Sequence, residues 1–340
     1  MHLETINNGN EPRERHITLR SQPDLTALKK QSPENTIIYL YIKTARMAMR
    51  DPKTYHNYCD LAGQMDREVL SYIKDLVSLD DKEHVLDVGC GPGINTYRNM
   101  TTFLPKGSTV TGVDISSEMV EFAEKHYSSP SMKFIKLDIT DSNLWPTWRK
   151  EEFSKVFSFF TLHRVLNQRK AYENMYNLLK PGGEIITVTP IEDGLDILAP
   201  FLARLPKYAK YADKIKRMNV QFNPSENNFN ETKNILEGLG FKIKICETML
   251  KTFCAPSIDY VAEFYGVISC LSNILPKKLY DEALTDIKKI LIENELLERC
   301  NRGYILKYNL LVVLAKKKEI KNETKLKIKE INSFKSYCIK

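Results

Sequence analysis

The stretch that most constrains how this chain folds is residues 85–93, with the sequence VLDVGCGPG. Its first four residues make a short, mostly apolar run, which is typical of a buried strand. Three glycines then alternate with two other residues, in the order Gly89, Cys90, Gly91, Pro92 and Gly93. Glycines let backbone N–H groups approach an anionic ligand at a helix start, where a Cβ would block the approach or forbid the φ values. The stretch predicts a ligand site; the alternative is an ordinary strand-to-helix turn.

The spacing of the glycines separates two classes of cofactor. A dinucleotide-binding fold has the pattern GxGxxG, whereas here Ile94 occupies the third glycine position and the glycine comes one residue earlier. The DxGxGxG form resembles the first motif of class I S-adenosylmethionine-dependent methyltransferases. The resemblance implies that Asp87 lies under the loop, near the methionyl ammonium of the cofactor. It also implies that the loop contacts the cofactor through Gly89, Cys90, Gly91 and Gly93.

Two more acids end candidate strands. Asp114 follows Gly93 by 21 residues, and a carboxylate there can accept hydrogen bonds from both hydroxyls of a ribose. The alternative for Asp114 is a helix N-cap. Asp138 ends the next strand, where it can accept from the exocyclic amine of adenine; the alternative is a loop acid. Apolar surface for the adenine ring, or else ordinary core, would come from Ile115, Met119 and Ile139.

The fourth candidate strand ends close to the expected position of the methyl group. Phe160 is predicted to contact the cofactor there, and Leu162, His163 and Arg164 follow it. His163 is a candidate base or hydrogen-bond donor to substrate, and the alternative is a structural histidine. The segment contains no Asn-Pro-Pro-Tyr, the pattern of enzymes that methylate exocyclic amines of bases.

The order of elements predicts the fold class. Strands are expected at residues 84–88, 109–113, 132–136, 155–160, 184–189, 241–246 and 306–315. Helices are expected between them, at residues 94–103, 117–126, 168–179 and 226–238. This alternation predicts an α/β, Rossmann-like, doubly wound sheet of seven mostly parallel strands. Apolar insertions at about 194–222 and 257–299 predict a helical cap over the carboxyl edge of the sheet, where open α/β sheets bind ligands.

Net charge and composition limit the remaining possibilities for domain organisation and binding partners. The net charge is +7, and residues 316–340, with nine lysines against three glutamates, carry +6 of it, which leaves +1 for residues 1–315. We therefore predict a polar N-terminal extension at 1–50, a methyltransferase domain at 51–318 and a lysine-rich tail at 319–340. The nearly neutral body does not favour a nucleic-acid partner. No apolar run is long enough for a membrane span, and nothing in the pattern specifies an oligomeric state.

The seven cysteines include no C-x-x-C pair, so the sequence predicts no metal site. The first twenty residues lack the apolar centre of a secretion signal and contain acids, which disfavours a mitochondrial transit peptide. These features favour reduced thiols in a cytoplasmic enzyme.

Three further segments, FSFFTLH at 157–163, Asn167-Gln168 and 174–183, are similar to the arthropod juvenile hormone acid methyltransferases, and the resemblance extends from about Tyr55 to Lys316. It implies esterification of a long apolar isoprenoid acid such as farnesoic acid. Gln64 matches a glutamine near the substrate carboxylate, and Arg164 stands where the family has tryptophan. Gln64, His163 and Arg164 are thus the candidate catalytic residues.

A carboxylic acid with a pKa near 4.3 is ionised at pH 7 and needs no general base. O-methylation of a small apolar acid is therefore the leading hypothesis. The alternatives are a catalytically weak cofactor-binding protein, an enzyme for another small molecule, and a nucleic-acid methyltransferase recruited by the basic tail.

Overall fold

The computed structural model describes residues 51–193, 198–218 and 227–319, all within the larger of the two compact units of the chain, residues 44–340. The predicted N-terminal extension, the tail beyond Glu319 and both ends of the first insertion lie outside the described residues. No helix in the described ranges is long and apolar enough to cross a membrane.

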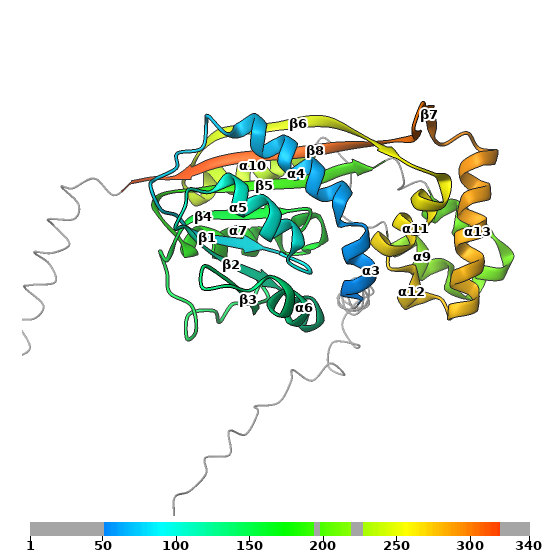
Figure 1. The fold of residues 1–340 in the computed structure, drawn as a ribbon, viewed down its shortest axis with the longest axis horizontal. Coiled ribbons are helices and arrows are strands. Elements are labelled where there is room, and N and C mark those ends of the chain that lie inside the picture. The colour runs from blue at the N-terminus through cyan, green and yellow to red at the C-terminus, as the bar shows by residue number, and fades with distance from the viewer. Residues whose placement is uncertain (1–50, 194–197, 219–226, 320–340) are drawn as a thin grey trace, which may run out of the picture. The chain divides into compact units, whose positions relative to one another are not determined.

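An eight-stranded sheet organises the described chain (Figure 1). Its strands are β1 (His84–Val88), β2 (Thr109–Asp114), β3 (Met132–Lys136), β4 (Phe153–Phe159), β5 (Leu179–Asp193), β6 (Phe241–Ala255), β7 (Glu298–Cys300) and β8 (Gly303–Lys317). The order is β3-β2-β1-β4-β5-β8-β6, with the short β7 paired to β8. The strands β1 to β5 pair in parallel, and β8 runs antiparallel to both β5 and β6. The predicted doubly wound, mostly parallel sheet is confirmed, with β7 as an additional strand.

Side chains of the sheet alternate between two apolar cores. In β8, Leu310, Val312 and Leu314 face one core while Leu311, Val313 and Ala315 face the other, because successive strand residues point to opposite faces. Figure 1 shows α4 (Cys59–Ile73) and α5 (Thr101–Phe103) on one face and α7 (Gln168–Leu178) and α10 (Asn227–Leu239) on the other. Helix α6 (Ser117–Tyr127) joins the core of α4 through Val120 and Ala123.

Strand β5 begins with a β-bulge opposite β4, and glycines in the bulge make it possible. Phe153 of β4 pairs with Leu179 of β5, yet Lys155 pairs with Glu184, so four residues bulge between them. Gly182 in this bulge has φ +79°, and a Cβ on Gly183 would meet the Ser154 carbonyl at 2.7 Å. The Pro-Gly-Gly sequence at 181–183 therefore lies inside the paired strand, which begins at Leu179, before the strand expected at 184–189.

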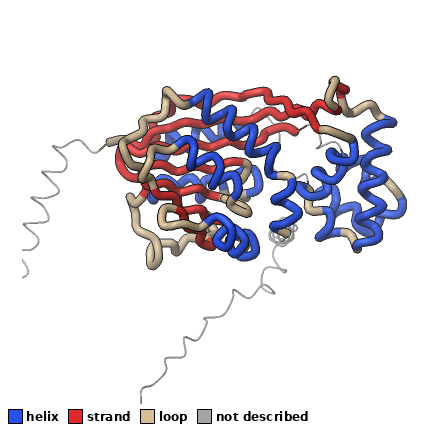
Figure 2. The backbone as a smooth tube through the Cα atoms, in the orientation of Figure 1, coloured by secondary structure: helices blue, strands red, loops and turns tan. Residues whose placement is uncertain are grey.

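The described residues of the two insertions form mainly helices (Figure 2). The first forms α8 (Leu198–Arg204), the 3₁₀ helix η3 (Pro206–Tyr211) and α9 (Ala212–Met218), and the second forms α11 (Ile258–Ile268), α12 (Leu271–Ile274) and α13 (Lys277–Glu293). Tyr208 joins them, since its buried hydroxyl donates to Asp286 at 2.6 Å. The short helix α3 (Pro52–Asn57) contacts α6 through His56, and Tyr58, which follows α3, donates to Glu263 of α11. The two insertions are therefore joined to each other by Tyr208, and the second insertion is joined to the sheet domain through α3 and Tyr58.

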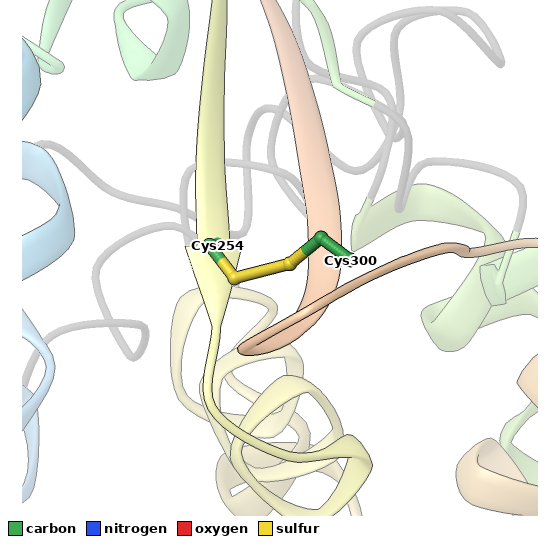
Figure 3. The surroundings of a disulfide bond; sticks show 2 residues. All are labelled: Cys254 and Cys300. Carbon is green, nitrogen blue, oxygen red and sulfur yellow. A yellow bond between two sulfur atoms is a disulfide. The ribbon is translucent and has the colours of Figure 1, made fainter.

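The prediction of reduced thiols is wrong for one pair, because Cys254 and Cys300 form a disulfide (Figure 3). The two cysteines are 46 residues apart and lie on β6 and β7. Both strands pair with the first residues of β8, one on each side, so the sheet brings the two thiols together. The bridge closes the base of the second insertion. Cys59, Cys90, Cys246 and Cys270 are free.

Candidate functional site

The three glycines of the loop all have positive φ, but they face different surroundings. A Cβ on Gly89 would collide with Thr161, and one on Gly93 would lie 2.7 Å from the Ala123 side chain. A Cβ on Gly91 (φ +54°) would meet nothing closer than the Tyr55 ring at 3.8 Å. Gly91 is therefore the glycine of this loop at which a Cβ would meet only an ordinary contact, so it leaves the most room for a ligand. Gly91 and Cys90 are both buried, and the Cys90 thiol donates to the Gly91 carbonyl.

Asp114 ties the glycine loop to the end of β2. One carboxylate oxygen accepts from the Gly91 backbone N–H at 3.0 Å and the other accepts from the Ser116 N–H at 2.9 Å. The N-cap of α6 is Ser116, whose hydroxyl accepts from the Met119 N–H, so Asp114 does not have the alternative role of a helix cap. Burial raises the pKa of Asp114, and the backbone hydrogen bonds oppose that rise. Each oxygen keeps a lone pair with which it can accept a ligand hydroxyl.

Asp87 lies beneath the loop, on the same side of the sheet as α4. It is buried, and the hydroxyl of Thr96 donates to its carboxylate at 2.5 Å. Burial raises the pKa of Asp87 to about 6; the Thr96 hydrogen bond opposes the rise, and the charge of Asp114 adds to it. A cationic ligand group is the natural partner of such a carboxylate, since it would offset the cost of burying the charge.

Tyr55 of α3 enters this site, although no motif in the sequence indicates it. Its ring is the nearest group to the open side of Gly91. Burial raises the pKa of its phenol, on which the charges of Arg164, Asp114 and Asp66 also act. Tyr55 thus lies near residues of three other segments: Asp114 at the end of β2, Arg164 after β4 and Asp66 of α4.

The apolar residues predicted to contact adenine differ in accessibility. Ile115 is 46% exposed directly after Asp114, whereas Met119 and Ile139 are buried core residues. Asp138 holds a turn, because its Oδ1 accepts from the backbone N–H and hydroxyl of Thr140 at 2.9 and 2.6 Å. Its Oδ2 has no partner among the described residues. Ile115 and Asp138 thus keep accessible groups for a ligand, whereas the side chains of Met119 and Ile139 are part of the buried core.

The end of β4 has a strained backbone. Phe160 has φ +51°, a region that costs a bulky residue energy, and its N–H donates to the Val188 carbonyl at 2.8 Å. The Thr161 hydroxyl, 3.3 Å from the Gly89 carbonyl, packs against the glycine loop. The strained turn therefore places the segment after β4 next to the loop after β1.

His163 is buried in the 3₁₀ turn η2 (Leu162–Arg164), and its Nδ1 has no hydrogen-bond partner among the described residues. Burial, helped by the charge of Arg164, lowers its pKa well below the usual range. The imidazole is therefore neutral at pH 7, and no carboxylate of the described chain orients it.

The Arg164 side chain points toward α11 of the second insertion. Its Nη2 donates at 2.6 Å to the carbonyl of Ile268, the last residue of α11. A cation is favourable there because the carbonyls at a helix C-terminus are unpaired and carry negative partial charge. The guanidinium makes no other hydrogen bond to a described residue. Its remaining N–H groups can therefore donate to a ligand.

Gln64, the third predicted catalytic residue, is exposed on α4, and its amide donates to Glu68 at 3.1 Å. Glu68 also pairs with Lys251 of β6. This position differs from that of Gly63 and Asp66 on the same helix, which face the segment after the glycine loop. The structure thus places His163 and Arg164 in one turn after Thr161, which contacts the loop, whereas the Gln64 amide bonds within its own helix.

These residues fit the cofactor that the sequence predicts. Gly91 offers the open approach, Asp114 has acceptors for ribose hydroxyls, Ile115 presents exposed apolar surface, and Asp87 is a buried acid suited to an ammonium. In the described ranges, no three His, Cys, Asp or Glu side chains are grouped as metal ligands.

Comparison with known proteins agrees with this arrangement. Residues 79–237 match the family described as "Methyltransferase domain". The juvenile hormone acid O-methyltransferase of Bombyx mori is 29% identical over 242 residues, which cover 68% of this chain and 83% of that protein. Its namesake in Drosophila melanogaster is 30% identical over 258 residues, covering 70% and 82%. The malonyl-[acyl-carrier protein] O-methyltransferase 1 of Ilyobacter polytropus is 29% identical over 182 residues, covering 51% and 64%. The chain belongs to the juvenile hormone acid O-methyltransferase family of S-adenosylmethionine-dependent methyltransferases.

Proposed function

We propose that this enzyme esterifies the carboxylate of a small apolar acid, an isoprenoid or fatty acid such as farnesoic acid or juvenile hormone acid. The observation that carries the proposal is Arg164, an inward-pointing guanidinium at the end of β4, fixed to the cap on one side and with donors to spare. A guanidinium binds a carboxylate through two parallel hydrogen bonds. The names of the relatives, which refer to juvenile hormone acid and to a malonyl group, support an acid as methyl acceptor.

The state of His163 also supports an acid. A phenol or alcohol must lose a proton on transfer, whereas a carboxylate is already ionised at pH 7. His163 is neutral, and its depressed pKa makes it a weak base. In this proposal His163 helps to shape the site, and no residue removes a proton from the substrate.

The protein then contributes orientation and exclusion of water. When bound, S-adenosylmethionine supplies an electrophilic methyl group and a neutral thioether leaving group. Arg164 would hold one edge of the carboxylate and so aim an oxygen at the methyl position. Orientation of this kind lowers the barrier by roughly 7–11 kcal/mol. The same hydrogen bonds reduce the nucleophilicity of the oxygens, so Arg164 favours tight binding over fast turnover.

The apolar part of the substrate would lie against the cap. Tyr208, Phe264 and Tyr265 are buried in the core that the cap shares with the sheet, whereas Phe201, Leu205 and Tyr260 are only partly buried against it. The latter three are therefore the stronger candidates to contact a substrate chain. Tyr260 lies beside Tyr58, 5.4 Å between ring centroids, where α3 meets α11.

The test is methyl transfer from labelled S-adenosylmethionine to matched acceptors. Farnesoic acid and saturated acids of about eight to fifteen carbons are compared with farnesol, which has the same chain without the carboxylate. We expect ester formation with the acids, a Michaelis constant that falls with chain length, and no transfer to farnesol. Transfer to the alcohol alone, or no transfer to any acid, would contradict the proposal.

Arg164 is tested separately. Arg164→Gln removes a charge-assisted contact of about 1.5–3 kcal/mol, so the Michaelis constant for the acid should rise roughly 10- to 100-fold while that for the cofactor stays constant. Arg164→Trp, which restores the family residue, should weaken acid binding and raise the rate constant. Exposed Arg169 provides the matched control, Arg169→Gln. If the Arg164 variants behave like this control, the substrate is held by other residues.

A further inference from the structure

A second buried acid lies beside Asp87 and has no role in the proposed transfer. Asp66, on α4, is 2% exposed. One of its carboxylate oxygens accepts from the Asn99 amide at 3.2 Å, and the other, Oδ1, is buried with no hydrogen-bond partner among the described residues. A buried carboxylate oxygen without a partner costs stability, so its presence calls for a ligand or a proton.

One helical segment positions both acids. Thr96 and Asn99 belong to the π-helical turn η1 (Thr96–Met100) that follows the glycine loop, and they donate to Asp87 and Asp66 respectively. Both donors lie in this one short turn, which contacts α4, and Asp87 acts electrostatically on Asp66. The two carboxylates therefore lie near each other where the segment after the glycine loop packs against α4.

The packing of α4 at this point is close. A Cβ on Gly63 would lie 2.5 Å from the side-chain oxygen of Asn95, which is itself buried and unpartnered in the described chain. Asn95 uses its amide to donate to the Cys59 carbonyl of α4 at 3.2 Å. Asp66 Oδ1 and Asn95 Oδ1 are thus two buried acceptors without a donor among the described residues, both located where the segment after the glycine loop packs against α4.

The charges around Asp66 do not neutralise it. Asp87 raises its pKa and Arg67 of the same helix lowers it, but burial dominates and raises the pKa well above the usual range. The other titratable groups that act on this pair are Asp114 of β2, Cys90 of the loop, and Tyr55 and Cys59 of α3 and α4. All of these are acids or neutral groups. A cation that enters here would therefore meet two uncompensated acceptors.

We propose that Asp66 is a second acceptor for the methionyl ammonium of the cofactor, so that Asp66 and Asp87 together form a two-carboxylate ammonium site under the glycine loop. An ammonium has three N–H donors and matches this set of buried acceptors. Asp114 holds the opposite, ribose end of the same ligand, and Gly91 leaves the path between them open. The inference rests on the cofactor alone and is independent of which acid is methylated.

The site carries a proton when the cofactor is absent. Two buried carboxylates with little cationic compensation cannot both stay ionised, so the pair binds a proton that the ammonium then replaces. Cofactor binding is therefore coupled to proton release near neutral pH. The pH dependence of affinity follows, because affinity should rise as the pair loses its proton.

Calorimetry tests the inference without catalysis. S-adenosylhomocysteine, which has the ammonium, is titrated at pH 7 in buffers with low and high ionisation enthalpy, and 5′-methylthioadenosine, which lacks the amino-acid part, is titrated in parallel. The wild-type protein should release protons with the first ligand and none with the second. Equal release with both ligands would overturn the proposal, and this measurement needs no variant.

The variant Asp66→Asn keeps the side-chain shape and an oxygen for Asn99. We expect it to weaken S-adenosylhomocysteine binding at least tenfold, to reduce proton release, and to leave 5′-methylthioadenosine binding within twofold. The control is Asp75→Asn, which makes the same charge change at an exposed residue beyond the end of α4. A purely structural Asp66 would give equal losses for both ligands, and an irrelevant one would give no loss. Either result refutes the proposal.

Discussion

At the scale of single residues, the glycines of the loop have separable roles. Gly91→Ala places a methyl group in the open side of the loop, so S-adenosylhomocysteine affinity should fall more than tenfold while the free energy of unfolding falls by only about 1–2 kcal/mol, the cost of a left-handed alanine. Gly93→Ala should cost about 3 kcal/mol or more, because overpacking against Ala123 adds to the same backbone strain. Denaturant unfolding and calorimetry measure both quantities. A Gly91→Ala protein with wild-type affinity would remove the loop from the binding site.

The proximity of some candidate residues was predictable from their own motifs, whereas their roles stay predictions. Asp87, Gly91 and Asp114 lie together, because the ends of neighbouring parallel strands meet at one edge and their order follows from the βαβ pattern. The inward direction of Arg164 was not available from its neighbours, since its partner carbonyl at Ile268 is 104 residues away. The same holds for Tyr55 and Asp66. Each acquires its environment from helix packing, which local spacing does not specify.

At the scale of elements, the disulfide closes the second insertion at its base. Cys254 and Cys300 are separated by 46 positions in the sequence, and a cross-link over such a distance contributes about 2–4 kcal/mol by restricting the unfolded chain. A reducing agent should therefore lower the unfolding midpoint of the wild-type protein and leave the double variant Cys254→Ser, Cys300→Ser unaffected. Cys246→Ser, which removes a free thiol, should still respond to the reductant like the wild type. A wild-type midpoint that does not move would show that the bridge adds nothing.

The positions of the elements were largely predictable, whereas the full lengths of β5 and β6 and the details of strand pairing were not. The strands and the helices flanking the sheet follow from apolar periodicity, which is a local property. The bulge at 180–183 and the three-residue β7 depend on which strands become neighbours. The prediction that Cys254 and Cys300 are reduced was wrong for this reason. The two thiols are brought together only by the antiparallel pairing of β6 and β7 on both sides of β8.

At the scale of the whole molecule, the positive net charge is concentrated in residues 316–340, at and beyond the end of the last strand, β8. The buried Lys317 at the end of β8 donates to the carbonyls of Tyr176 and Leu179 at 3.0 and 2.8 Å, so the last strand is anchored before the lysine-rich segment begins. Deleting residues 320–340 should leave the unfolding midpoint and the turnover of a water-soluble acid unchanged, as measured by thermal denaturation and methyl transfer. A loss in either one would assign the segment a place in the fold.

The position of β8 in the sheet also sets the order in which the sheet can be completed. Its two long neighbours, β5 and β6, are synthesised before it, and β6 pairs with no other strand of the described chain. Until β8 emerges from the ribosome, each neighbour presents an edge of unpaired N–H and C=O groups, which attracts other strands. A chain interrupted within the second insertion would therefore be prone to aggregate even though its cofactor-binding half is complete.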